Sequence, residues 1–267
     1  MKNRKTHMMG QVFLVSPHIA EIEAAHAIGK NVLEIGPGQG ILTRALLRNA
    51  RLVVGVEKDR GLYSALKMSI ASKKLKLLHM DFFDATDEEL QLGKVDIVIS
   101  NVPYSLSSRI IGWLAEKRMQ AVLCLQKEFV DHMLAEPDTR EYSNISVTTA
   151  LCFRVTKIME VGRNNFRPVP LVDSSIIYMK PLHGMPGREE LKIIAAMMQH
   201  KKKKVRNALI DSSWSLGIEK GEMVKIADAV RNNGGRVFKL APSELLELSR
   251  EVIKRANIPI NKCRKGF

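Results

Sequence analysis

Four consecutive residues, Asn-Val-Pro-Tyr at positions 101–104, carry the clearest chemistry in the sequence. They follow the apolar run 95–100, which is rich in β-branched residues and typical of a buried strand. The Asn101 amide and a backbone carbonyl near Pro103 could accept both hydrogens of a planar exocyclic amine. Tyr104 offers a ring on which a flipped base could stack. The tetrapeptide indicates N-methylation of a base, and a plain strand-to-helix turn with an Asn cap is the alternative.

A glycine-rich loop follows the strand expected at 31–35. It reads Gly-Pro-Gly-Gln-Gly over residues 36–40 and precedes a helix expected at 41–49. Glycines at such a turn let the backbone approach a ligand and present amides at a helix N-terminus. The spacing Gly-x-Gly-x-Gly after Glu34 differs from the Gly-x-Gly-x-x-Gly of dinucleotide-binding proteins. The loop therefore predicts a nucleotide-type cofactor without phosphate.

Two acidic residues follow the next two expected strands. Glu57 ends the second, at 51–56, where a carboxylate can accept hydrogen bonds from both hydroxyls of a ribose; a surface carboxylate paired with a neighbouring cation is the alternative. Asp81 follows the third, at 75–79, and could accept from an adenine amino group, with Phe82 against the ring. Asp81 could instead cap the following turn.

A proline-stiffened loop at residues 164–170 exposes a second aromatic ring, that of Phe166. This ring could form a second stacking wall for the base, and a buried hydrophobic anchor is the other interpretation.

Alternation of strand-like and helix-like segments predicts an α/β fold. Strands are expected at 31–35, 51–56, 75–79, 95–100 and 120–126, with further candidates at 145–160 and 174–179, which makes about seven. Helices are expected at 16–28, 41–49, 62–72, 107–117 and 127–135. Because the first four strands each end in a candidate contact, we expect the ligands at the carboxyl edge of the sheet.

The pattern becomes helical after a Pro- and Gly-rich segment at 181–187. Helices are expected at 188–199, 201–212, 222–231 and 242–256. We therefore expect a domain over 1–181 and a small, all-helical domain over 182–267.

Charge distinguishes the second of these domains. The chain carries a formal charge of +14, and residues 182–267 hold 18 basic against 9 acidic side chains. Lys201, Lys202, Lys203, Lys204 and Arg206 are the densest cluster, and four lysines in a row would occupy every face of a helical turn. The cluster predicts phosphate contacts with RNA, and a solubilising helix end is the alternative.

No apolar stretch approaches the ~18 residues of a membrane span, and no apolar core follows the basic N-terminus, so we expect a cytoplasmic protein. Cys124, Cys152 and Cys263 are widely spaced, which favours reduced thiols. We expect no metal and, without a long apolar heptad, a monomer.

A series of motifs runs in one order along nearly the whole chain. It comprises Gly10-Gln11-x-Phe13-Leu14, Glu34-Ile35-Gly36-Pro37-Gly38, Glu57, Asp81, Asn101-Val102-Pro103-Tyr104, Leu125-Gln126-Lys127-Glu128, Phe166-x-Pro168 with Val172-Asp173-Ser174, and a basic helix at 201–209. The series closely resembles the KsgA-type ribosomal RNA adenine dimethyltransferases, and its order makes it more specific than any single motif.

The resemblance implies a Rossmann-like class I methyltransferase domain that uses S-adenosylmethionine. The expected activity is N6-dimethylation of two adjacent adenines near the 3′ end of small-subunit (16S) rRNA, with the assembling 30S particle as partner and a role in ribosome biogenesis. The resemblance also implies roles for individual residues. The cofactor would contact Gln11, Leu14, Gly36, Gly38, Gly40, Glu57, Asp81, Phe82 and Asn101, while Asn101 and Pro103 would hold the target amine between Tyr104 and Phe166.

Two departures from the family pattern are informative, and the second of them, at Val102, favours an archaeal-type member. Val12 stands where bacterial relatives have Asn, which removes one polar cofactor contact, and Val102 stands where many have Leu. Other classes stay open: a large-subunit rRNA adenine methyltransferase, a ribosome-assembly RNA-binding factor with secondary activity, and a DNA amino-methyltransferase. A dehydrogenase fits least, because the glycine spacing differs.

Overall fold

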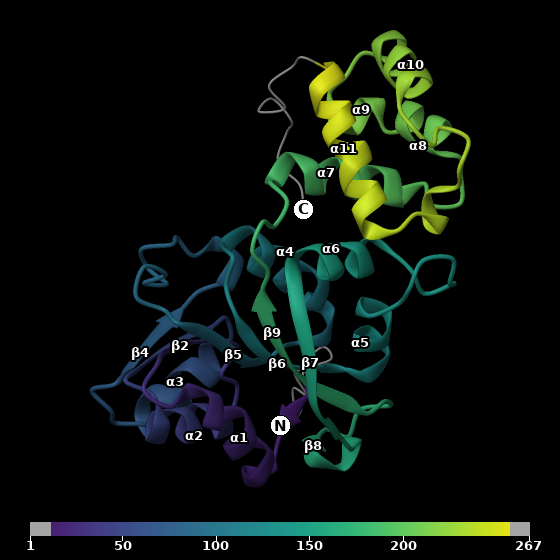
Figure 1. Cartoon of the computed structure of the whole chain (residues 1–267). Coiled ribbons are helices and arrows are strands. Elements are labelled where there is room, and N and C mark those ends of the chain that lie inside the picture. The colour runs from purple at the N-terminus through teal and green to yellow at the C-terminus, as the bar shows by residue number, and fades with distance from the viewer. Residues whose placement is uncertain (1–11, 257–267) are drawn as a thin grey trace, which may run out of the picture. The chain divides into compact units, whose positions relative to one another are not determined.

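A computed structural model describes residues 12–256. Its centre is a seven-stranded sheet in the order β4-β3-β2-β5-β6-β9-β7, which confirms the expected α/β class (Figure 1). The strands are β2 (Asn31–Ile35), β3 (Leu52–Glu57), β4 (Leu75–His79), β5 (Ile97–Asn101), β6 (Ala121–Gln126), β7 (Phe153–Val161) and β9 (Ser174–Pro181). The pairs from β4 through β6 are parallel, whereas β9 is antiparallel to β6.

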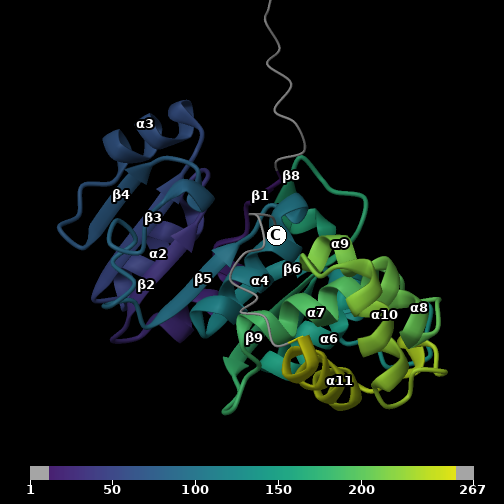
Figure 2. The same ribbon diagram turned by 90° about the horizontal axis from the view of Figure 1, so that it is seen from above.

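The strand order reverses between β2 and β5. From β2 the chain adds β3 and β4 on one side, and β5 and β6 follow on the other, an order that Figure 2 also shows. Parallel α/β sheets bind ligands at the carboxyl ends of the strands beside such a switch point. The loop 36–40 follows β2, and Asn101 ends β5 next to Cys124 of β6 in the register.

Helices α1 (Pro17–Ala24) and α2 (Ile41–Asn49) lie side by side and pack on the sheet (Figure 1). Pro17 begins α1 with its φ already suited to a first turn, and the one-turn helix η1 (Ala25–Ala27) continues it. The buried face of α1 holds Ile19, Ala20 and Ala24, and it also holds Glu23. An ionisable side chain on such a face requires a specific partner.

Short elements complete this part of the molecule. They are α3 (Arg60–Ser69), η2 (Phe82–Asp84), η3 (Tyr104–Leu106), η4 (Arg163–Asn165), β1 (Phe13–Leu14) and β8 (Phe166–Arg167). Strands β1 and β8 form a two-stranded antiparallel ribbon in which Leu14 is the register partner of Phe166. This ribbon brings the N-terminal segment beside the predicted base-stacking residue.

The strand expected at 145–160 is partly wrong. Its first half is helix α6 (Asn144–Cys152), and strand β7 begins only at Phe153. The Ser143 backbone N–H donates to Ser146 Oγ at 3.0 Å, which satisfies an amide at the helix start, and Val147 is fully buried. Capping and tertiary packing therefore override the strand preference of the Thr- and Val-rich sequence.

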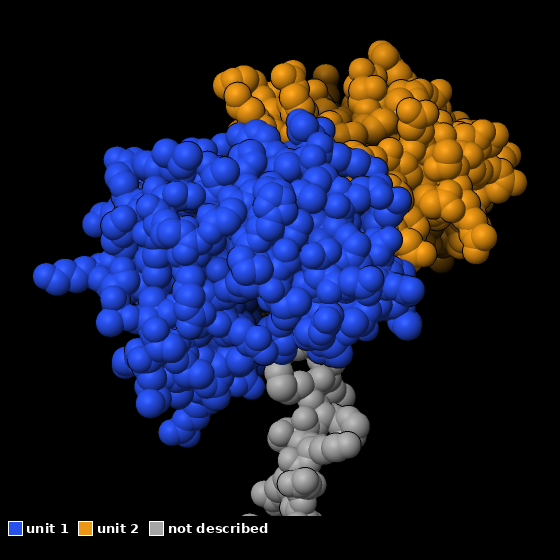
Figure 3. Space-filling view, turned by 90° about the horizontal axis from the view of Figure 1, so that it is seen from below, with its two compact units in different colours: residues 1–107, 119–127, 155–179 blue, residues 108–118, 128–154, 180–267 orange. Residues whose placement is uncertain are grey.

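The chain divides into two compact units, coloured in Figure 3. The first comprises residues 1–107, 119–127 and 155–179, and the second comprises 108–118, 128–154 and 180–267. The helices of the second unit are α4 (Ser107–Lys117), α5 (Lys127–Met133), α6, α7 (Arg188–Gln199), α8 (Val205–Asp211), α9 (Ser213–Leu216), α10 (Lys220–Ala229), η5 (Val237–Lys239) and α11 (Pro242–Ala256). A domain boundary at residue 181 stays a prediction.

The second unit has its own hydrophobic core, built mainly from α7, α8, α10 and α11. Tyr142 is fully buried in it and donates from its hydroxyl to the Leu240 carbonyl at 2.9 Å. Within residues 12–256, no helix combines the length and apolar composition needed to cross a bilayer.

Candidate active site

The glycine-rich loop at residues 36–40 is hydrogen-bonded to a buried carboxylate, that of Glu57. Glu57 is 4% exposed; its Oε2 accepts from the Gly38 N–H at 2.9 Å and its Oε1 from the Asp59 N–H at 2.8 Å. Gly38 has φ +58, and a Cβ there would lie 2.9 Å from Phe13 Cδ1, so this position requires glycine. Glu57 is thus part of the loop architecture and not a surface carboxylate paired with a cation.

Asp81 has the turn-capping contact that the sequence offered as an alternative. Its Oδ1 accepts from the Phe83 N–H at 3.0 Å, and its Oδ2 pairs with Lys58 Nζ at 2.8 Å. Phe82 is buried, with its ring edge-on to that of Phe83 at 5.1 Å.

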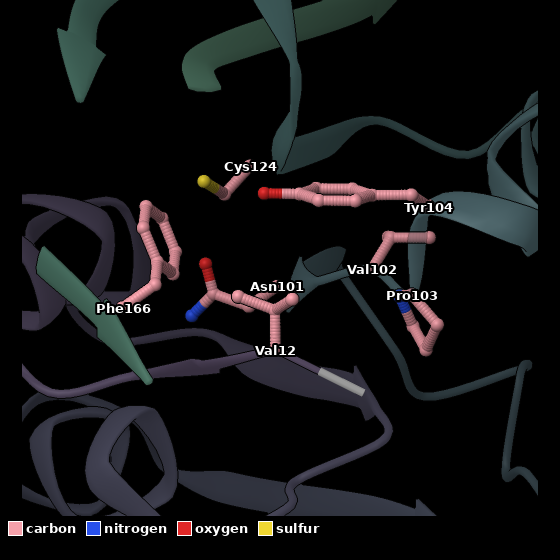
Figure 4. A pocket seen from close by; sticks show the side chains of 7 residues that line it. All are labelled: Val12, Asn101, Val102, Pro103, Tyr104, Cys124 and Phe166. Atoms are coloured by element: carbon pink, nitrogen blue, oxygen red, sulfur yellow. The ribbon is translucent and has the colours of Figure 1, made fainter. Parts of the chain in front are cut away.

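A pocket lies where the Asn-Val-Pro-Tyr turn meets the β1–β8 ribbon. It is lined by Val12, Asn101, Val102, Pro103, Tyr104, Cys124 and Phe166 (Figure 4). The structure therefore brings together all four residues predicted to bind the target base. The cavity measures about 20 Å³, which is room for one water molecule and far too little for a purine. A base could enter only if lining side chains move.

The two aromatic rings differ in how firmly they are held. Tyr104 is half-buried, and its hydroxyl lies 2.8 Å from Ser174 Oγ. Burial raises the pKa of Tyr104, so the phenol stays neutral at physiological pH. Phe166 is 3% exposed. This burial is typical of a hydrophobic anchor, the alternative to a stacking role that the sequence left open. Figure 4 shows the Tyr104 hydroxyl pointing toward Cys124 and Phe166.

Asn101 has one satisfied and one unsatisfied end. Its Nδ2 donates to Glu23 Oε2 at 3.2 Å, whereas its Oδ1 is buried and has no hydrogen-bond partner among residues 12–256. Figure 4 shows this oxygen directed into the pocket, on the side of Cys124 and Tyr104. Buried carbonyls without partners are rare because the lost hydration is not replaced. The pocket thus offers an acceptor to a ligand that brings its own N–H group.

Two carboxyl groups near the site are buried: that of Glu23, which contacts Asn101, and that of Glu34 on β2. Burial raises the pKa of Glu23 to about 8 and that of Glu34 to about 8. Glu34 also lies near Glu57, which raises its pKa further, and its Oε2 has no hydrogen-bond partner among the described residues. Both carboxyl groups are therefore mainly neutral at pH 7.

Three of the residues around the pocket were missed by the sequence analysis. Cys124 could have been found as the neighbour of Asn101 on the adjacent parallel strand. Glu23 interrupts an apolar helix face, which is a readable signal, whereas nothing marked Ser174 as the partner of Tyr104. Gln11 lies outside the described residues.

The lysine cluster is not helical, contrary to expectation. Residues 201–204 form a turn, and α8 begins at Val205. This turn pairs with the segment that contains Arg236: the Val205 N–H donates to the Gly235 carbonyl at 2.8 Å, and the Val237 N–H donates to the Lys203 carbonyl at 3.1 Å. Those backbone contacts replace the first helical turn that periodicity predicted.

Some of the cations in and beside this turn have hydrogen-bond or ion-pair partners, and others do not. Lys201 Nζ donates to the carbonyls of Arg140 and Tyr142 at 3.0 and 2.5 Å, so its ammonium ties two segments together. An open groove in the second unit is lined by Lys202, Lys203, Lys204, Arg206, Asn207, Ile210, Asp211 and Arg236. Lys203 pairs with Asp211, and Arg206 pairs with Asp228. The Lys202 and Lys204 ammonium groups have no such partner within residues 12–256.

Comparison with known proteins identifies the family. The family model for ribosomal RNA adenine dimethylase matches residues 2–233. A probable ribosomal RNA small subunit methyltransferase A of Methanosphaera stadtmanae is 36% identical, covering 82% of each chain. A protein of the same name from Thermococcus gammatolerans is 31% identical over 99% of this chain and 95% of its own.

Solved structures agree with the sequence comparisons. A dimethyladenosine transferase from Plasmodium falciparum superimposes with a TM-score of 0.73 at 25% identity, covering 91% of this chain and 98% of its own. The 23S rRNA methyltransferase ErmE shares the fold, with a TM-score of 0.57 at 24% identity, covering 90% and 99%. The chain belongs to the ribosomal RNA adenine dimethylase family.

Proposed function

We propose that this protein transfers methyl groups from S-adenosylmethionine to N6 of two adjacent adenines near the 3′ end of small-subunit rRNA, placing two on each. The observation that carries the proposal is the buried, partnerless Asn101 Oδ1 in a pocket with two aromatic rings. An exocyclic amine on a flat ring supplies the missing donor and suits the rings. Family membership and the small-subunit names of the archaeal relatives support the choice of substrate.

The residues at the carboxyl ends of β2, β3 and β4 fit the cofactor. We assign Glu57 to the ribose hydroxyls and Asp81 with Phe82 to the adenine, because these residues follow β3 and β4 at the edge where the parallel strands end. Leu14 and the glycines at 36, 38 and 40 would shape the rest of the site. When bound, S-adenosylmethionine supplies a methyl group that its sulfonium has already activated.

The chain's own residues orient the amine. Asn101 Oδ1 would accept one N6 hydrogen, and the Pro103 carbonyl, which accepts from the Leu106 N–H at 2.8 Å and has a second lone pair, would accept the other. Holding both hydrogens favours a pyramidal nitrogen whose lone pair points at the methyl group. The apolar walls of Val12, Val102 and Phe166 exclude water. Alignment and desolvation would suffice: the nitrogen becomes cationic once it is methylated, and its acidic N–H proton then passes to water, so no strong general base is needed.

Removing the Tyr104 ring should weaken catalysis through lost stacking. Tyr104→Ala should lower kcat/KM for rRNA by about 5- to 150-fold, which corresponds to roughly 1–3 kcal/mol per stacked base. Tyr104→Phe keeps the ring and loses only the 2.8 Å contact with Ser174, so it should stay within about threefold of the wild type. Steady-state kinetics on both variants tests this. Equal losses for Phe and Ala would assign the role to the hydroxyl and contradict stacking.

The open basic groove is the proposed RNA-binding surface, with Lys202 and Lys204 as its free cations and Lys203 and Arg206 beside them. Lys202→Ala/Lys204→Ala should weaken rRNA binding and reduce the slope of log K against log salt by about 1.4 to 1.8. Lys225→Ala, which alters an exposed lysine of α10 outside the groove, should leave the slope unchanged. Fluorescence anisotropy at several salt concentrations measures both. An unchanged slope in the double variant would exclude phosphate contacts by these two residues.

We further propose a cytoplasmic monomer that acts on the assembling small subunit.

The activity test is transfer of label from S-adenosylmethionine to unmethylated small subunits, large subunits and duplex DNA in parallel. Label on the small subunit alone supports the proposal. Label on large subunits or on DNA would replace it with one of the other methyltransferase classes, and cofactor binding without transfer to any of the three would favour an RNA-binding assembly factor.

A further inference from the structure

Glu23 is a buried acid that the proposed reaction does not yet use. It is 0% exposed and sits on the apolar face of α1, with Ile19, Ala20, Ala24 and Ala27 around it in the helix. A buried carboxyl group is costly unless it is paired or hydrogen-bonded. The contact that distinguishes Glu23 is the hydrogen bond from Asn101 Nδ2 to its Oε2, while its Oε1 has no partner within residues 12–256.

This contact bears on which end of the Asn101 amide faces the pocket. The oxygen and nitrogen ends of an asparagine amide have almost the same shape, so hydrogen-bond partners decide its orientation. An ionised carboxylate can only accept, and it therefore takes the amide NH₂ and leaves the oxygen for the pocket. A turned amide would present two donors to an amine that also donates, and the pocket would lose its acceptor.

We propose that Glu23 is a positioning residue that holds the Asn101 amide with its carbonyl oxygen toward the target amine. This inference rests on the proposed function, which identifies the target amine. The orientation of the Asn101 amide depends on this chain alone. Glu23 reaches Asn101 across 78 residues of sequence, from α1 to the end of β5, so the contact depends on the packing of α1 against the sheet.

The protonation state of Glu23 should decide how firmly it selects this orientation. A protonated carboxyl has a hydroxyl that can donate to Asn101 Oδ1, so both amide orientations become satisfiable. Burial favours that neutral form, and Glu34 on β2 favours it further. Cys124 on β6 also faces Glu23, and its thiol stays neutral because burial raises its pKa. Elsewhere on this helix and its extension, Glu21 pairs with Arg48 of α2, and His26 stacks on Tyr178.

Three variants separate positioning from a merely structural role. Glu23→Ala removes the acceptor, and Glu23→Gln restores one carbonyl without a titrating proton. Glu21→Ala is the matched control, because Glu21 lies on the same helix and forms an exposed ion pair. The rate is measured in a single turnover at saturating S-adenosylmethionine and saturating small subunits, so that binding does not enter.

Glu23→Ala should lower the single-turnover rate by about a hundredfold, as expected for a misoriented reacting group, with the cofactor Kd from calorimetry nearly unchanged. Glu23→Gln can donate as well as accept, as the protonated acid can, so its rate should match the low-pH rate of the wild type at every pH. The wild-type rate should rise with pH as Glu23 ionises, and the Glu23→Gln rate should lack this step. A wild-type rate in Glu23→Ala, or the same pH step in Glu23→Gln, would overturn the proposal, and Glu21→Ala should match the wild type throughout.

A spectroscopic test works without turnover. In protein labelled at asparagine amides, the Asn101 side-chain NH₂ resonance, identified by its loss in Asn101→Ala, should shift with pH as Glu23 titrates and stay constant in Glu23→Gln. If the wild type fails to methylate small subunits while this titration is present, the proposed function fails and the Glu23–Asn101 contact stands. If methylation is present and the titration is absent, the inference fails alone.

Discussion

Replacing Asn101 with alanine should lower the methyl-transfer rate on small subunits by about a hundredfold to a thousandfold. The variant removes the buried Oδ1 acceptor, and the loss of one preorganised hydrogen-bonding group at a reacting centre costs about 2.7–4 kcal/mol of barrier. It also leaves the Glu23 carboxyl without its amide donor. Single-turnover kinetics at saturating cofactor measures the effect on the chemical step.

The control for this variant is Thr149→Val, which removes another buried oxygen without a partner in the described chain, but from α6 in the second unit. Because valine keeps the shape of threonine, the rate should stay near that of the wild type. If Asn101→Ala retained the full rate while the cofactor still bound, the pocket acceptor would have no catalytic role and the mechanism would be wrong.

The folded protein should lose stability as pH rises from about 5 to 8. The pKa values of Glu23 and Glu34 are raised from 4.5 to about 8, so in this interval the folded chain keeps protons that the unfolded chain releases. The free energy of unfolding then falls by up to about 1.4 kcal/mol per pH unit for each such carboxyl, or several kcal/mol across the interval. Below pH 4.5 both states are protonated and this penalty disappears.

Glu23→Gln and Glu34→Gln should each flatten this pH dependence, because an amide has no proton to lose. Each should raise the free energy of unfolding at pH 8 and change it little at pH 5. Urea denaturation of the wild type and both variants at the two pH values measures this. The lowered pKa of His26 has the opposite effect near pH 6.5, but it is common to all three proteins and cancels in the comparison. Equal slopes in wild type and variants would show that neither carboxyl is buried in its neutral form.

Much of the fold could be predicted from the sequence because the strands of the sheet are short apolar runs that alternate with helical segments. The expected strands at 31–35 and 75–79 and the helix at 107–117 have the bounds that the structure shows. The order of the strands along the chain also placed Asn101 at the carboxyl edge of the sheet, because parallel strands end at the same edge. The strand order reverses between β2 and β5 at this edge. The ligand roles assigned to these positions stay proposals, whereas their convergence at one edge is a property of the structure.

The differences arise where distant segments decide local structure. Ser146 Oγ donates to the His132 carbonyl at 2.6 Å and helps make 144–152 a helix, and backbone pairing around Arg236 turns 201–204 away from helix. Neither contact is readable from local periodicity. The site showed the same limit: the local sequence predicts Asn101 as an acceptor, but the partner that its amide contacts lies 78 residues away on α1.

The most direct test of the proposed activity is identification of the modified nucleotides. Unmethylated small subunits are incubated with the protein and S-adenosylmethionine, and the 3′-terminal region of the rRNA is analysed by mass spectrometry. We expect N6,N6-dimethyladenosine at two adjacent positions, and far less of it from Asn101→Ala within the same incubation time. Methylation of a different atom or base, or of these adenines by Asn101→Ala at the wild-type rate, would contradict this expectation.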